Sequence, residues 1–239
     1  MNIVITNDDG VRAPALPHLI RWARQFGDVT TIAPKVEQSG KSHAIDFMKE
    51  IEIKQVELAP DVTAYSVDST PADCVRYGVT SLGKKFDLVI SGINRGYNLG
   101  ADIVYSGTIG AVFEACRLGI PGIALSANPG DESDAVKHLD AVAAFIREHK
   151  LLEQHSLYNV NVPPTVNGVR VTRQGGIFFT DVFVHHGNDI YLQEGELVPG
   201  EGKDPEVDID AIFNGYVSIT PLMTTLTNLP LFEKLKDLR

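Results

Sequence analysis

The chain has 239 residues, of which 44% are hydrophobic and 22% charged, the composition of an ordinary globular protein with a sizeable core. Its 21 basic and 31 acidic residues give a formal net charge of −10. An acidic protein gains nothing from counterion release, so we expect no surface for a nucleic-acid polymer. An anionic substrate would instead need positive potential from a metal ion or a helix N-terminus.

The two cysteines and the start of the chain bear on the compartment. Cys74 and Cys116 are the only cysteines, and each lies in an apolar helical pattern. Two buried thiols favour a reducing environment, without a disulfide framework or a zinc site. The sequence opens directly on a strand pattern and shows neither a signal-peptide pattern nor a membrane span. We therefore expect a cytoplasmic protein that has no membrane partner.

The first ten residues hold the most informative pattern. Residues 3–5 are a β-branched apolar run without polar alternation, which predicts a strand buried on both faces of a parallel sheet. Asn7, Asp8 and Asp9 follow this strand, at the edge where ligands bind in open α/β sheets. Adjacent carboxylates repel each other, and a hard divalent cation would neutralise them. The alternative is an ordinary turn that ends at Gly10.

The next elements predict a β-α-β unit. A helical pattern at 14–26 leads to a strand at 28–33, which should lie parallel to the first strand with a right-handed crossover. The loop 34–42 leaves the same edge as Asp8 and carries Ser39 among its hydroxyl and amide groups. These groups could supply oxygen ligands or phosphate donors, or the segment could be only a solvated loop.

The chain continues with strand, helix and strand patterns. The runs 50–58 and 63–67 predict added strands that could pair in antiparallel fashion. A helix should begin with Thr70 as its N-cap, because proline follows at the first helical position. The strand at 86–90 runs into Asn94, whose amide oxygen is an acceptable ligand for a hard cation. Asparagine is also common in turns, so both interpretations stay open.

A Ser-Gly-Thr sequence marks the start of another helix, which should end at Gly119. Gly107 allows close approach, and backbone N–H groups together with the hydroxyls of Ser106 and Thr108 would make a seat for an anion. The same residues would also form an ordinary helix cap. The pattern is not a Walker loop, because no Gly-Lys-Ser/Thr follows a glycine-rich run.

Strand and helix patterns alternate up to a strand at 158–162. This order predicts a doubly wound, Rossmann-like α/β core over residues 1–165 with a mostly parallel sheet. Residues 166–239 differ, because short β-like runs are separated by glycine, asparagine and proline. They predict a β-rich extension with an antiparallel lobe or hairpins and a terminal helix at 231–238.

The side chains predicted at the carboxyl edge share one chemistry. Aspartate, serine and asparagine all offer hard oxygens, which favour Mg²⁺, Mn²⁺ or Ca²⁺ over zinc. A hard cation beside an anion-binding helix end suggests a phosphate ester as the substrate. Metal-assisted hydrolysis would follow from that arrangement.

The chain resembles the SurE family of survival-protein nucleotidases along nearly its whole length. The matching motifs are Ile-Thr-Asn-Asp-Asp-Gly at 5–10, Gln-Ser-Gly at 38–40, Thr-Pro-Ala-Asp-Cys-Val at 70–75, Ser-Gly-Ile-Asn at 91–94, Asn-Leu-Gly at 98–100, Tyr-Ser-Gly-Thr at 105–108, Asn-Val-Asn-Val-Pro at 159–163, Asp-Ile-Asp-Ala at 208–211 and Gly-Tyr-Val-Ser-Ile-Thr-Pro at 215–221. Their order along the chain makes a chance match a poor explanation.

The resemblance implies a phosphatase that hydrolyses nucleoside 5′- and 3′-monophosphates with broad specificity and needs one divalent cation, Mg²⁺ or Mn²⁺. It implies a homodimer or homotetramer that exchanges C-terminal elements. It also implies site residues. The metal ligands it implies are Asp8, Asp9, Ser39 and Asn94, with Asp8 and Asp9 as the catalytic pair. The phosphate-binding residues it implies are Asn98, Ser106, Gly107 and Thr108.

Other functions and mechanisms stay open. A haloacid-dehalogenase-type phosphatase would space its acidic pair at i and i+2, whereas Asp8 and Asp9 are adjacent. A phospho-acceptor receiver domain would need an aspartate where Ser91 stands, and it would leave about half of the chain unexplained. A nucleotide-binding module without turnover is a third alternative. We favour a water nucleophile over direct attack by an aspartate, which would form an aspartyl-phosphate.

Overall fold

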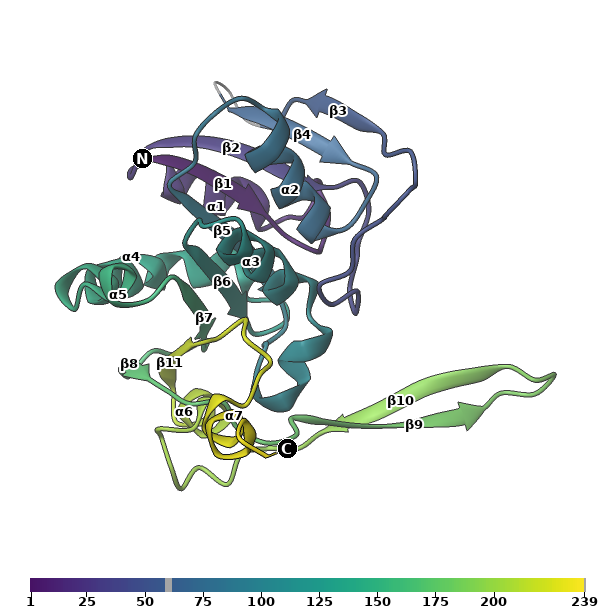
Figure 1. Cartoon of the computed structure of the whole chain (residues 1–239), viewed down its shortest axis with the longest axis vertical. Coiled ribbons are helices and arrows are strands. Elements are labelled where there is room, and N and C mark those ends of the chain that lie inside the picture. Colours follow the sequence, from purple (N-terminus) through teal and green to yellow (C-terminus); the bar gives the residue numbers. More distant parts are fainter. Residues whose placement is uncertain (59–61, 239) are drawn as a thin grey trace.

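A nine-stranded sheet forms the body of the protein in the computed structural model, which describes residues 1–58 and 62–238 (Figure 1). Its strand order is β3-β4-β2-β1-β5-β6-β7-β11-β8. The strands are β1 (Asn2–Thr6), β2 (Asp28–Pro34), β3 (Ile53–Val56), β4 (Thr63–Val67), β5 (Leu88–Arg95), β6 (Gly122–Ala127), β7 (Leu157–Val162), β8 (Gly168–Val171) and β11 (Tyr216–Pro221).

The sheet is mostly parallel, which confirms the predicted doubly wound α/β class. Strands β4, β2, β1, β5, β6 and β7 run parallel, while β3 pairs antiparallel with β4 and β11 pairs antiparallel with β7. Strand β1 lies in the interior of the sheet, and Ile3, Val4 and Ile5 are fully buried. Burial on both faces explains why this strand shows no polar alternation.

Helices cover both faces of the sheet (Figure 1). On one face, α1 (Leu16–Ala23) and α4 (Glu132–Glu148) pack with Ile3 and Ile5 in one apolar cluster. On the other face, α2 (Pro71–Ser81) and α3 (Gly107–Arg117) pack against Val4 in a second cluster. Successive side chains of a strand point to opposite faces, so β1 joins the two layers.

The N-termini of α2 and α3 follow the predicted capping rules. Thr70 Oγ1 accepts a hydrogen bond from the Asp73 amide at 3.2 Å, and proline occupies the first turn of α2. Ser106 Oγ accepts from the Ile109 amide at 3.2 Å at the start of α3. Each side chain satisfies one of the four N–H groups that a helix start leaves unpaired.

The C-terminal part of the chain divides between the sheet and a projection. Strands β8 and β11 continue the main sheet beyond β7. Strands β9 (Phe179–His185) and β10 (Tyr191–Leu197) instead form a separate antiparallel hairpin, which extends far from the body (Figure 1). The terminal helix is α7 (Leu229–Leu235).

Three short helices escaped prediction from the sequence: η1 (Gly100–Tyr105), α5 (Leu151–Gln154) and α6 (Asp208–Phe213). Each has six residues or fewer, too few for a 3.6-residue period to emerge. In the described part of the chain, no helix is both long and apolar enough to cross a membrane.

Candidate active site

Asn7 makes the side-chain hydrogen bonds of the turn after β1, so this turn does not use the carboxylates of Asp8 and Asp9. Asn7 Nδ2 donates to the Gly10 carbonyl at 3.1 Å, and the Gly10 amide donates to Asn7 Oδ1 at 3.1 Å. Gly10 has a φ of +97°, a conformation that glycine adopts without strain. The turn therefore needs the asparagine and the glycine, and it does not explain the acidic pair.

Asp8 is buried against the first turn of α3. The residue is only 4% exposed, and Oδ1 accepts a short hydrogen bond of 2.5 Å from Thr108 Oγ1. A Cβ atom added at Gly107 would lie 3.0 Å from Asp8 Cβ and 3.1 Å from Oδ2. Burial raises the pKa of Asp8 above its usual value, although the hydrogen bond from Thr108 opposes this shift. The glycine lets the helix terminus approach the carboxylate.

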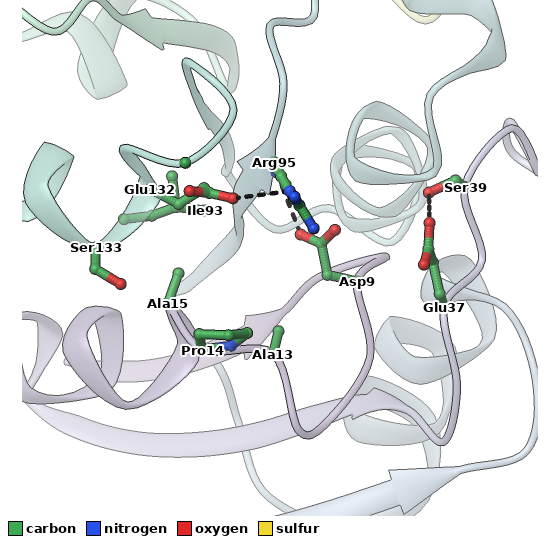
Figure 2. Close-up of a pocket in the computed structure, with 11 residues that line it drawn as sticks. Asp9, Ala13, Pro14, Ala15, Glu37, Ser39, Ile93, Arg95, Glu132 and Ser133 are labelled. Carbon is green, nitrogen blue, oxygen red and sulfur yellow. Dashed lines mark hydrogen bonds and ion pairs between the residues drawn. The ribbon is translucent and has the colours of Figure 1, made fainter.

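Asp9 lies in a more open position at the same edge. Asp9 Oδ2 accepts a hydrogen bond of 3.3 Å from the Arg95 amide, at the end of β5 (Figure 2). Burial, followed by the neighbouring charge of Asp8, raises the pKa of Asp9 to about 6. Glu37 and Glu132 add further negative potential. Burial raises the pKa values of both carboxylates, and a bound cation would stabilise their charged forms.

The loop after β2 reaches Asp8 through its backbone. The Gln38 amide donates to the Asp8 carbonyl at 2.7 Å, which brings Ser39 to the site. The Ser39 hydroxyl donates to Glu37 Oε1 at 2.7 Å (Figure 2). Its oxygen still carries lone pairs that could serve a cation.

A buried carboxylate holds the far part of this loop. Glu114 of α3 lies 2.8 Å from the His43 imidazole, and it also pairs with Arg76 at 2.9 Å and Arg117 at 2.7 Å. Although burial opposes ionisation, the hydrogen bonds from Arg117, His43 and Arg76 lower the pKa of Glu114. Nothing in the sequence pattern singled out this cluster, because its members come from three separate elements.

Asn94 lies near the end of β5, and Asn98 lies in the segment that follows this strand. Asn94 Nδ2 donates to the Gly96 carbonyl at 2.8 Å, so its amide oxygen is the atom that could act as a ligand. Asn98 is buried, and its Nδ2 donates to Ser126 Oγ at 2.8 Å. Nδ2 has a second proton that could reach an anion.

Two asparagines of β7 hold the backbone of Asn98. The carbonyl of Asn98 accepts from Asn159 Nδ2 at 2.9 Å and from Asn161 Nδ2 at 2.8 Å, and its amide donates to Asn161 Oδ1 at 2.9 Å. These positioning residues alternate with valines along the strand, so they share one face. That alternation was the signal that could have found them.

The predicted site residues thus fall into two groups. Asp8, Gly107 and Thr108 are in direct contact, and Asp9 is bonded to the residue that follows Asn94. Ser39 joins Asp9 in the lining of a cavity of about 420 Å³. Ser106 instead lines a different cavity, on the side of α3 that carries Phe113.

The residues present fit a hard cation. Among residues 1–58 and 62–238, no three His, Cys, Asp or Glu side chains cluster as a metal site. A cation here would therefore have two carboxylates, with hydroxyl, amide and water oxygens completing its shell. Mg²⁺ is usually bound in this way, through one or two carboxylates and several waters.

Comparison with known proteins gives one consistent family. The family model of survival protein SurE matches residues 3–180. A protein of Thermosipho africanus called 5′-nucleotidase SurE is 37% identical over 250 residues, covering 99% of this chain and 97% of that protein. A protein of the same name from Desulfitobacterium hafniense is 39% identical, covering 100% and 96%. The crystal structure of SurE from Aquifex aeolicus superposes with a TM-score of 0.82 at 32% identity, covering 99% and 98%.

Proposed function

The chain belongs to the SurE family, and on that premise we propose that it is a metal-dependent 5′-nucleotidase. It hydrolyses nucleoside 5′- and 3′-monophosphates to nucleoside and phosphate, with broad specificity. The observation that carries the proposal is the pair of carboxylates with raised pKa values, one of them in contact with the first turn of α3. The carboxylates offer negative potential to a cation, and the N-terminus of α3 beside them offers positive potential to a phosphate.

Asp8 and Asp9 would hold one Mg²⁺ or Mn²⁺ together with Ser39 and Asn94. When bound, the cation would neutralise the acidic pair and polarise the phosphoryl group. We propose Mg²⁺ or Mn²⁺ as the cation in the cell because all four side chains offer hard oxygen ligands.

The chain's own groups then bind and orient the phosphate. Gly107 has no side chain to block close approach, and the N-terminus of α3 stabilises negative charge on the phosphoryl oxygens. The second Nδ2 proton of Asn98 is a further donor, and Ser106 contributes as the cap of the helix, with its hydroxyl oxygen accepting from the Ile109 amide. Asp9, the more accessible carboxylate, orients the attacking water and accepts its proton.

We further propose that the protein works as a homodimer or homotetramer. The hairpin of β9 and β10 exposes Phe183 at 72% and Tyr191 at 57%, and α7 exposes Phe232 at 50%. Apolar side chains gathered on projecting elements mark an interaction surface, and a second copy of the chain presents matching elements. The free thiols of Cys74 and Cys116 support a cytoplasmic location.

A phosphatase panel tests the proposed function. Release of inorganic phosphate is measured from 5′-AMP, 5′-GMP, 5′-CMP, 5′-UMP and 3′-AMP with Mg²⁺, with Mn²⁺ and with a chelator. We expect steady turnover that the chelator removes and that either cation restores. Binding without turnover would indicate a nucleotide-binding module, and turnover that resists the chelator would refute the metal requirement.

A further inference from the structure

Two cavities of similar size border the loop after β2. The Asp9 cavity, of about 420 Å³, includes Asp9, Ser39, Ile93, Arg95 and Glu132 in its lining. The Phe113 cavity, of about 400 Å³, is lined largely by other residues, among them Ser42, His43, Ser106, Phe113 and Leu226. Each is large enough for a small ligand. The base and ribose of a nucleotide substrate would occupy one of these two cavities.

The loop after β2 separates the Phe113 cavity from the carboxylates. The Gln38 carbonyl lies 3.3 Å from the position of a Cβ on Gly107, and the Ser42 carbonyl lies directly against Gly110. Ser42 is fastened there, because its amide donates to the Tyr105 carbonyl at 2.9 Å. The backbone of this loop therefore lies against α3 at Gly107 and again at Gly110. Of the two cavities, the Asp9 cavity is the one that contains a carboxylate of the acidic pair.

The Asp9 cavity has one apolar wall and one hydrogen-bonding edge. Ile93 and Pro14 supply apolar surface, while Arg95 and Glu132 form an ion pair in the lining (Figure 2). Arg95 Nε lies 3.5 Å from Glu132 Oε1, and the Glu132 side chain is only 16% exposed. An acidic edge disfavours further phosphate groups, and it suits hydroxyl donors.

Resting on the proposed function, we propose that the Asp9 cavity binds the nucleoside half of the substrate, with Glu132 accepting a hydrogen bond from the ribose 2′-hydroxyl. Arg95 couples the two halves of the site. Its amide donates to Asp9, and its guanidinium pairs with Glu132 through Nε while the side chain is 71% exposed, so the planar face can stack on the base. A stacking contact accepts any base, in keeping with broad specificity. The substrate class is therefore ribonucleoside monophosphates in preference to their 2′-deoxy counterparts.

The test compares kcat/KM for 5′-AMP and 5′-dAMP in wild type, Glu132→Ala and Glu132→Gln. Because the Glu132 charge also acts on Asp9, the ratio of the two substrates is the readout rather than either rate. We expect wild type to prefer 5′-AMP by about tenfold, the size of one hydrogen bond to a charged group. In Glu132→Ala the ratio should fall to about one, with an intermediate value in Glu132→Gln. Glu148→Gln, at the other end of α4, is the matched control and should keep the wild-type ratio.

The outcomes separate this inference from the proposed function. If wild type hydrolyses both nucleotides with a ratio near one, or if Glu132→Ala keeps the wild-type ratio, the ribose contact is refuted while the phosphatase stands. If neither nucleotide nor p-nitrophenyl phosphate is hydrolysed with any cation, both are refuted. A KM for 5′-AMP that rises in Glu132→Ala with little change in kcat would further support a binding role.

Discussion

In folded proteins charged groups are usually exposed and large apolar groups usually buried. The carboxyl edge of the sheet and the C-terminal hairpin depart from this rule in opposite ways. At the edge, Asp8 is a charged group that is buried. On the hairpin, Phe183 is a large apolar group that is 72% exposed. Both arrangements cost free energy in an isolated chain, because burial penalises charge and water penalises apolar surface. Each is thus best explained by something that binds there.

The difference lies in what must bind. A carboxylate pair of which Asp8 is buried calls for a small ion of opposite charge, held by rigid elements such as β1 and α3. An exposed apolar hairpin calls for a broad partner surface, and a long two-stranded ribbon can adjust its position to meet one. Substitutions in the two regions should accordingly change different properties, turnover in the first and assembly in the second.

The largest effect is expected from Asp8→Asn. The amide keeps the size of the side chain but removes the charge, so kcat should fall by roughly 10³-fold, as when a major electrostatic contact is lost. Circular dichroism should show an unchanged fold. Asp134→Asn, whose side chain is 76% exposed, is the control and should keep its activity. Near-normal turnover in Asp8→Asn would refute the metal assignment.

A smaller effect is expected from Gly107→Ala. The added Cβ would press on Asp8 at 3.0 Å and shift the helix terminus away from it, so kcat should fall by about 100-fold. Gly176→Ala, where a Cβ meets nothing within 4 Å, should leave turnover unchanged. Both variants are assayed on 5′-AMP with Mn²⁺. Equal rates would show that the contact between α3 and Asp8 has no part in catalysis.

In the hairpin, Phe183→Asp should weaken assembly without removing turnover per assembled site. A charge placed at the centre of an apolar interface loses its water, which should raise the dissociation constant at least about tenfold. Sedimentation velocity against protein concentration measures the change, with Thr180→Asp on the same strand as the control. A wild type that sediments as a monomer would refute the proposed assembly.

The smallest effect is expected from the pH dependence of the metal-free protein. The pKa of Asp9 is about 6 in the folded state against 3.8 as the ordinary value, so the folded state binds more protons between these values. Stability should therefore fall as pH rises through that window. Thermal unfolding in chelator at pH 4.5 and 7 should show a smaller loss in Asp9→Asn. An identical loss in both proteins would show that Asp9 is not the group responsible.

Much of the fold could be predicted from the sequence because its signals are local. The apolar run at β1 and the capping sequences of α2 and α3 depend on a few neighbouring residues. The site was predicted less completely, because its contacts are not local. Asp8 meets Thr108 across 100 positions, and Glu114 gathers partners from other elements. That Ser106 faces a different cavity from Asp9 depends on how the loop after β2 packs, and no local pattern encodes it.

Metal binding is the most direct test of the central claim, that the acidic pair holds a hard cation beside the start of α3. Mn²⁺ is titrated calorimetrically into the chelator-treated wild type, Asp8→Asn, Asp9→Asn and Asp134→Asn. We predict one Mn²⁺ per chain in wild type and Asp134→Asn. In Asp8→Asn and Asp9→Asn the affinity for Mn²⁺ should be at least about 100-fold lower, because the loss of a residue that only supports a metal ligand can already lower metal affinity by that factor. Equal affinity in all four proteins would contradict the account.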